Sequence, residues 1–207
     1  MPIASCTRAA VAALTLLTVV SGASPASATE PDPSPHSKVR ADTAGMRQLI
    51  ADGAAGSAAF RALIDTIDRS DLVVYVECRL FPQRELRGRL GLVSATRNGR
   101  FAVIEIACYQ AHGSQVAILA HELQHAAEIA SAPWVVDAKT FERFYAAAGE
   151  LVNSDTWSRA YETSAAVESA RQVLRELREG DKLRAAARGA AARAQRELRQ
   201  IDTGGFK

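Results

Sequence analysis

The sequence lacks an uncharged apolar run of about 18 residues, the length that a membrane-spanning helix requires. Its longest apolar run, Ala9–Val20, falls short of that length and lies close to the N-terminus. No segment repeats along the chain, so a repeat architecture is not expected. These absences favour a globular protein without a transmembrane helix in its body.

The sequence also lacks an excess of charge of either sign. It contains 25 basic and 23 acidic residues, for a formal net charge of +2 at pH 7. Global charge therefore favours neither nucleic acid nor membrane as a partner. Cysteine is scarce as well, since Cys6 precedes the apolar run and only two others follow.

The first 28 residues have the order of a secretory signal peptide. Arg8 gives a basic region, Ala9–Val20 an apolar region, and Ala26–Ala28 the small residues of a cleavage site. We expect cleavage before Thr29, a secreted or periplasmic protein and no stable membrane anchor afterwards; an uncleaved anchor is the alternative. The remaining chain of about 180 residues is long enough for one domain.

Residues 29–41 are rich in Pro, Ser and charge with almost nothing apolar, which predicts a disordered linker. Asp42 can then cap a first helix and Ser57 a second. The apolar residues of these helices recur with helical spacing: Met46, Leu49 and Ile50 in the first, and Phe60, Leu63, Ile64 and Ile67 in the second.

The apolar period then changes to two, as in strands. Leu72–Cys78, Gly88–Ala95 and Phe101–Ala107 are predicted strands, and Asn98-Gly99 marks a tight hairpin between the last two. We expect an α+β fold in which a small antiparallel three-stranded sheet packs with a helical bundle.

Helices are predicted for the rest of the chain. Ser114 can cap a helix that runs to about Ala130, a second helix ends at Gly149, and a longer one spans about Asp155 to Arg178. The domain would thus cover residues 42–180. Residues 181–207 form a basic, Ala/Arg-rich helix or tail, for which attraction to an anionic surface or nucleic acid is one interpretation. A solvated helix is favoured because no aromatic residues are interleaved, and no nucleic-acid partner is expected.

Residues 121–125 read His-Glu-Leu-Gln-His, a zinc-hydrolase signature. On a helix, His121 and His125 lie one turn apart on the same face, where both can bind one metal ion. Glu122 lies about 100° around the helix, from where its carboxylate can reach a metal-bound water as a general base. The alternative is a helix whose histidines are merely hydrogen-bonded inside an apolar core.

A catalytic zinc site needs a third protein ligand, and four carboxylates were compared. Glu128 lies too far along the motif's own helix, Asp155 resembles a helix cap, and Glu168 can pair with a nearby arginine. Glu162 starts a stripe of small residues that would let its helix closely approach the helix that carries His121 and His125. We therefore predict Glu162 as the third ligand, with Glu168 as the main alternative.

The segments Leu119–His125 and Tyr161–Ala166, within the span Leu72–Arg178, resemble a minimal form of the gluzincin branch of zinc metallopeptidases. The resemblance implies that His121, His125 and Glu162 bind Zn²⁺ and that Glu122 activates a zinc-bound water to hydrolyse peptide bonds. The metzincin pattern is disfavoured because no glycine and third histidine follow the motif. An oxyanion-stabilising residue is not assigned; the candidates are Tyr145, Arg159, Tyr161 and His112.

If Phe101–Ala107 is an edge strand that borders the cleft, an extended peptide can pair with its free backbone groups. This favours a peptide or protein substrate over a glycan. Three hypotheses follow: an exported zinc peptidase, a zinc-binding domain without peptidase activity that acts by interaction, and an exported helical module without metal.

Cys78 and Cys108 share strand parity with residues on one face of the predicted sheet, so both sulfurs should point into the core. A disulfide between them would close a loop of about 30 residues and stabilise the fold by roughly 3 kcal/mol. Two buried free thiols are the alternative, and export favours the bridge.

Overall fold

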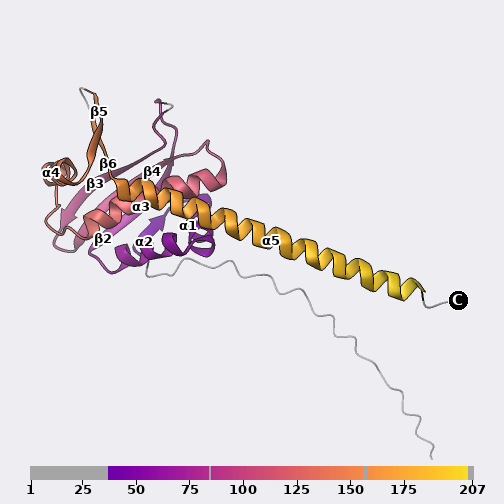
Figure 1. Cartoon of the computed structure of the whole chain (residues 1–207). Helices are drawn as coiled ribbons and strands as arrows, with labels where there is room; N and C mark the ends of the chain where they lie inside the picture. Colours follow the sequence, from indigo (N-terminus) through magenta and orange to yellow (C-terminus); the bar gives the residue numbers. More distant parts are fainter. Residues whose placement is uncertain (1–36, 84, 156–157, 205–207) are drawn as a thin grey trace, which may run out of the picture. The chain divides into compact units, whose positions relative to one another are not determined.

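The computed structural model describes residues 37–83, 85–155 and 158–204, and only the backbone of residues 153–155, 158–160 and 197–204. The predicted signal peptide, residues 1–28, lies outside the described residues, as does most of the predicted linker. The described chain has an α+β fold with five helices, a mixed four-stranded sheet and a separate two-stranded sheet (Figure 1).

The four-stranded sheet contains β1 (Val39–Ala41), β2 (Leu72–Arg79), β3 (Gly88–Thr96) and β4 (Gly99–Ala107), in the order β1-β2-β4-β3. β1 and β4 run parallel to β2, and only β3 and β4 are antiparallel. The prediction of an antiparallel three-stranded sheet is therefore wrong. The tight turn places β3 beside β4 as predicted. However, β4 and not β3 lies next to β2, and the β2–β4 pair is parallel.

Two consequences of this order also differ from the expectations. The predicted edge strand, Phe101–Ala107, lies in β4, which pairs on both sides; the edges are β1 and β3. Residues 39–41, assigned to the linker, form β1, in which Val39 pairs with Val74 and is buried. The Lys38 N–H donates to Asp68 Oδ1 at 2.7 Å, which fixes the start of this strand to the end of helix α2 (Ala58–Asp68).

Helices α1 (Ala44–Gly56), α2 (Ala58–Asp68) and α3 (His112–Ala130) contribute to a common core with one face of the sheet. Alternate strand residues are fully buried there: Leu72, Val74 and Val76 in β2, and Ala102, Ile104 and Ile106 in β4. Ser57 caps α2 as predicted, whereas Thr43 rather than Asp42 caps α1. α3 begins after Ala111 without a side-chain cap, so the predicted Ser114 cap is wrong.

The chain after α4 (Ala138–Ala148) departs from the predicted long helix. Glu150–Asp155 and Ser158–Glu162 form strands β5 and β6, which pair antiparallel, and α5 spans Ser164–Gly204. Asp155 therefore ends a strand and does not precede a helix. Thr163 Oγ1 accepts a hydrogen bond from the Ala166 N–H at 3.1 Å, as an N-cap residue does, and starts α5 nine residues later than predicted.

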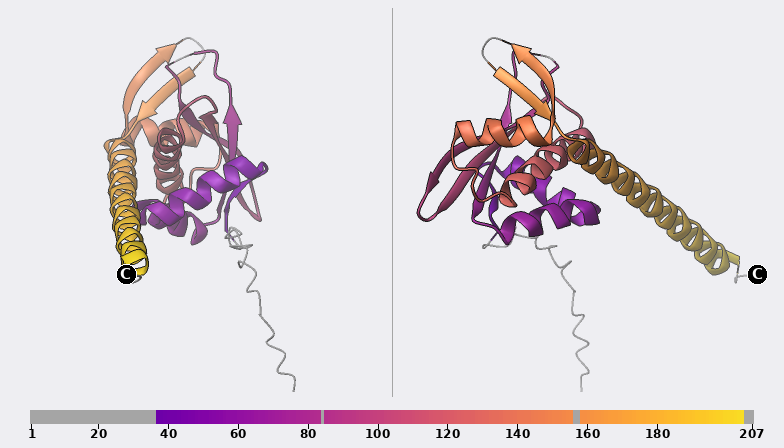
Figure 2. Two further views of the ribbon diagram at one scale, coloured as in Figure 1. Left: turned by 90° about the vertical axis from the view of Figure 1, so that its right-hand side faces the viewer. Right: turned by 60° about the vertical axis from the view of Figure 1, so that its left-hand side comes forward.

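α5 has two parts of different character (Figures 1 and 2). Its N-terminal part contributes the buried residues Ala166 and Val173 and contacts α1, α2 and α3. From Asp181 to Arg196 the side chains are exposed. The helix continues through Gly180 without a break, so the predicted boundary at residue 180 separates a packed from an exposed part of one helix.

A disulfide joins Cys78, near the end of β2, to Cys108, just after β4, with a Cα–Cα distance of 5.2 Å. Parallel pairing places the two strand ends side by side, since Cys78 pairs with Ile106 and Arg79 with Ala107. Cys78 is exposed and Cys108 half-buried. The expectation that both sulfurs point into the core is therefore wrong, because the buried alternation of β2 ends at Val76.

Candidate metal centre

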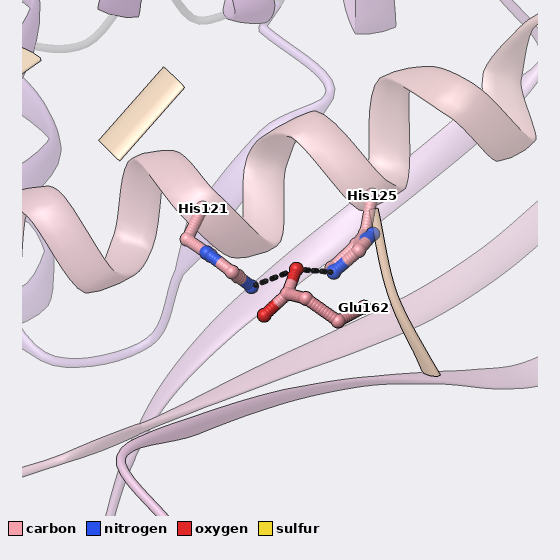
Figure 3. A group of neighbouring side chains, drawn as sticks. All are labelled: His121, His125 and Glu162. Atoms are coloured by element: carbon pink, nitrogen blue, oxygen red, sulfur yellow. Dashed lines mark ion pairs between the residues drawn. The ribbon is translucent and has the colours of Figure 1, made fainter. Parts of the chain in front are cut away.

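The two motif histidines project from the same face of α3 (Figure 3). Their ring centroids are 5.0 Å apart with the planes nearly perpendicular. His125 is buried and His121 half-buried. The four-residue spacing on a helix thus places both imidazole rings where they can bind one ion.

Glu162, the last residue of β6, lies between the two histidines (Figure 3). Its Oε1 atom is 3.2 Å from His121 Nε2 and 3.7 Å from His125 Nε2. One ligand atom from each residue lies within 4.8 Å of the others, close enough to hold one metal ion. Glu162 therefore joins the histidines from a strand and not from the predicted helix.

Glu162 does not start a helical stripe of small residues as predicted, because it lies on β6, although Ala166 and Ser169 of that stripe do face α3. Ala166 is fully buried, and Ser169 Oγ donates to Gln124 Oε1 at 3.0 Å. Glu168, the main alternative, is exposed and pairs with Arg175 at 2.7 Å. These contacts hold the start of α5 close to α3. Because β6 ends just before α5 begins, they also hold Glu162 close to the histidines of α3.

Glu122 is buried beneath the histidines, with 6% of its surface exposed. Burial raises the pKa of its carboxyl to about 7, while His125 opposes the shift and Glu162 adds to it. A Cβ atom at Gly88 of β3 would lie 2.6 Å from Glu122 Oε1 and 2.8 Å from Ile118 Cγ2. The carboxylate therefore packs directly against the backbone of the edge strand.

Glu128 links His125 of α3 to Thr163, the residue after Glu162. Its Oε2 atom lies 3.0 Å from His125 Nδ1, and its Oε1 atom accepts a hydrogen bond from Thr163 Oγ1 at 2.8 Å. Thr163 follows Glu162 directly, and its N–H donates to Glu162 Oε1 at 2.9 Å. With Nδ1 engaged by a carboxylate, His125 turns Nε2 toward Glu162. Thr163 was not predicted as part of the centre, because its contact with Glu128 depends on how the start of α5 packs against α3.

The histidines differ in their protonation. Burial, followed by the neighbouring His125, lowers the pKa of His121 to about 4. Burial also disfavours the charged form of His125, but the hydrogen bond to Glu128 and the surrounding carboxylates outweigh it and raise its pKa. At neutral pH His121 is neutral, so its contact with Glu162 is not an ion pair in spite of the short distance. A neutral imidazole is the form that binds a metal.

The four oxyanion candidates lie in different places. The Tyr145 hydroxyl is buried and donates to the His125 carbonyl at 2.9 Å, so it supports α3. His112 pairs with Asp52 of α1 at 2.9 Å. The side chain of Arg159 lies outside the described residues, whereas Tyr161 lines the cavity beside Glu162. Of the three candidates whose side chains are described, Tyr161 is the one that these contacts leave available.

The centre opens into a cavity of about 670 Å³. Its walls come from the segment before β3, from β3, α3, α4, β5 and β6, and from the N-terminal part of α5, and much of the lining is apolar. The apolar residues include Leu86, Leu90, Ile118, Phe141, Val152 and Leu174. The polar lining includes the two histidines, Glu122 and Glu162, together with Glu85, Arg87, Arg89, Ser114, Tyr145 and Tyr161.

Comparisons of the chain with protein-family models, with curated proteins and with solved structures found no match. Among the helices described between residues 37 and 204, none is both long enough and apolar enough to cross a membrane.

Proposed function

We propose that this chain is an exported zinc-dependent peptidase in which His121, His125 and Glu162 bind the metal ion and Glu122 is the general base. The observation that carries the proposal is the convergence of these three ligand atoms within 4.8 Å, with the Glu122 carboxylate in the wall of the same cavity. The signal-like N-terminus supports export, and the resemblance to gluzincins supports the reaction.

The residues present fit a zinc ion. Two imidazole nitrogens and one carboxylate oxygen are ligands that zinc commonly takes at catalytic sites, where a position is left for water or substrate. Glu128 holds His125 through Nδ1, and carboxylate partners of this kind orient and strengthen histidine ligands. The centre also borders a cavity, as a site that admits a substrate must.

A bound zinc ion supplies a Lewis acid that polarises a carbonyl group and lowers the pKa of water. Glu122 would accept a proton from the attacking water and later donate it to the leaving amine. Its pKa near 7 suits both directions of proton transfer at neutral pH. Apolar residues around the cavity limit the water that surrounds the carboxylate.

A peptide substrate is favoured by the position of β3. Among the described strands β3 pairs with β4 alone, and residues Gly88–Leu90 line the cavity. Its outer edge can therefore pair with an extended peptide, the role that the sequence analysis assigned to Phe101–Ala107 of β4. The pairing would hold a peptide bond across the metal centre.

Metal analysis of the purified protein tests the ligand set. We expect about one zinc ion per chain, none in His121→Ala or His125→Ala, and an affinity lower by orders of magnitude in Glu162→Ala. Glu168→Ala is the matched control and should bind zinc normally, because Glu168 is exposed and pairs with Arg175. A wild-type protein without zinc, or full zinc affinity in Glu162→Ala, would contradict the ligand set.

Glu122→Gln tests the reaction. The substitution keeps the size of the side chain but removes proton acceptance, so zinc should stay bound while hydrolysis of unstructured peptides falls at least about a thousandfold. Near-normal turnover in this variant would remove the role assigned to Glu122. A wild-type protein that binds zinc and cleaves no peptide would instead favour a zinc-binding domain that acts by interaction.

A further inference from the structure

The exposed part of α5 carries a concentration of positive charge that the global composition conceals. We call the segment Lys182–Arg196 the basic arm. It contains five cationic residues and no acidic residue: Lys182, Arg184, Arg188, Arg193 and Arg196. Since the net charge of the whole chain is +2, the rest of the chain carries −3. The basic arm is thus strongly positive, whereas the rest of the chain is slightly negative.

The cations of the basic arm are available to a partner. Every side chain from Lys182 to Arg196 is exposed. Arg184 pairs with Asp181 at 2.9 Å, and within the described side chains the other four cations have no ion-pair partner. In Figures 1 and 2 this part of α5 extends beyond the elements against which its N-terminal part packs.

The basic arm has two chemically different sides. At about 100° per residue, the five cations fall within one half of the helix circumference. The middle of the other half is apolar and consists of Leu183, Ala187, Ala190 and Ala194. Leu183 is 72% exposed, so this apolar side contacts little of the protein. A cationic half opposite an apolar half is typical of helices that lie at the surface of a lipid bilayer.

We propose that the basic arm binds the surface of an anionic lipid membrane, with the arginine side toward the lipid phosphates and the Leu183 side toward the acyl boundary. The attraction is electrostatic, because the apolar side is made mostly of alanine and would not hold the helix by itself. This proposal does not depend on the metal centre, which lies at the other end of α5.

Other partners fit the basic arm less well. Nucleic acid would engage the cationic half only, and the described arm has no aromatic residue on which a base could stack. A second copy of the arm would bring five cations against five without an acidic residue to offset them. An anionic membrane matches both halves.

Sedimentation with lipid vesicles tests the proposal, using the secreted protein with its N-terminus determined. We expect binding to vesicles of phosphatidylcholine with phosphatidylglycerol at low salt, little binding to phosphatidylcholine alone, and release at high salt. Each cation near an anionic surface strengthens binding about fivefold, so the triple variant Lys182→Gln/Arg188→Gln/Arg193→Gln should bind roughly 100-fold more weakly.

The matched control removes three exposed cations away from α5, in Arg69→Gln/Arg97→Gln/Lys139→Gln, and should bind anionic vesicles almost as well as the wild type. Both variants share the wild-type N-terminus, so the difference between them reports the basic arm alone. Equal binding by both variants would overturn the proposal, as would binding independent of lipid charge or no binding at all. Tighter binding to a DNA oligonucleotide than to vesicles, or an arm-dependent dimer in light scattering, would identify one of the other partners instead.

Discussion

Gly88 of β3 has no side chain, and this leaves room for the carboxylate of Glu122. The edge strand approaches α3 so closely at this point that a Cβ atom would collide with the Glu122 carboxylate. The nearest obstacle is the flexible end of a side chain, which can move, whereas the strand backbone is held by β4. Gly88 therefore acts as a positioning residue for the general base that we propose.

Gly88→Ala should displace the Glu122 carboxylate without disturbing the three proposed metal ligands. We expect zinc binding to remain and the turnover of peptides to fall by at least about tenfold, because misplaced catalytic groups lose rate steeply. Gly91→Ala is the control, since Gly91 lies on the same strand and a Cβ there would meet nothing within 4 Å. Both enzymes are compared by steady-state kinetics and zinc content, and equal turnover in the two variants would contradict the positioning role.

The residues of the centre were predictable to different degrees. His121, Glu122 and His125 stand close together in the sequence, so helical spacing alone indicates their relation. Glu162 was chosen by a helical argument, yet it lies on a strand. Its position depends on how the β5–β6 pair folds back toward α3, which no local pattern records. The contacts of Thr163 and Gly88 depend on the same long-range packing.

The C-terminal end of α3 is fixed by a buried arginine from the start of β4. Arg100 is 2% exposed, and its Nη1 atom donates to the carbonyls of Ile129 and Ala132 at 2.9 Å. Its Nη2 atom pairs with Asp71 Oδ1 at 2.6 Å. The positive charge of Arg100 also interacts favourably with the partial negative charge at the C-terminal end of the helix. α3 is thereby attached to the sheet at the end that follows the histidines.

Asp71→Asn should weaken this attachment in a pH-dependent manner. The hydrogen bond from Arg100 holds the pKa of Asp71 below its ordinary value of 3.8. Because the folded-state pKa is lowered, the ion pair stabilises the protein above about pH 4, and the contribution is lost as the pH falls through the lowered pKa. Asp71 is half exposed, so we expect a modest loss of about 1 kcal/mol in the free energy of unfolding at neutral pH.

Urea unfolding of wild type and Asp71→Asn from about pH 7 to about pH 2 measures this contribution. The two curves should converge in acid. Asp181→Asn removes the exposed pair with Arg184 and should change stability by less than about 0.5 kcal/mol at any pH. A difference for Asp71→Asn that stays constant with pH would contradict the assigned ion pair.

Individual elements were easier to predict than their arrangement. The period of apolar residues located β2, β3 and β4, and Asn98-Gly99 located their hairpin, where Gly99 has a φ of 137°. Strand order is different, since nothing local determines whether β3 or β4 lies beside β2. The β5–β6 strands were missed because they are short and hold each other in place, so their stability comes from pairing and not from their own residues.

At the scale of the whole molecule, the disulfide joins the two central parallel strands at one end of the sheet. The double variant Cys78→Ser/Cys108→Ser should unfold at a lower denaturant concentration, with a loss of about 3 kcal/mol. A phosphine reductant should lower the stability of the wild type toward that of the variant and leave the variant unchanged. Unchanged stability of the wild type after complete reduction would contradict this contribution.

The same bridge has a consequence for how damage to this protein would be detected. Cys78 and Cys108 are 30 positions apart, and the covalent ring that they close contains β3, β4 and the segment between β2 and β3. A protease that cuts a peptide bond inside this ring, even by self-digestion, leaves both fragments joined through sulfur. On a gel without reductant the nicked chain would migrate close to the intact one, and the fragments would separate only after reduction.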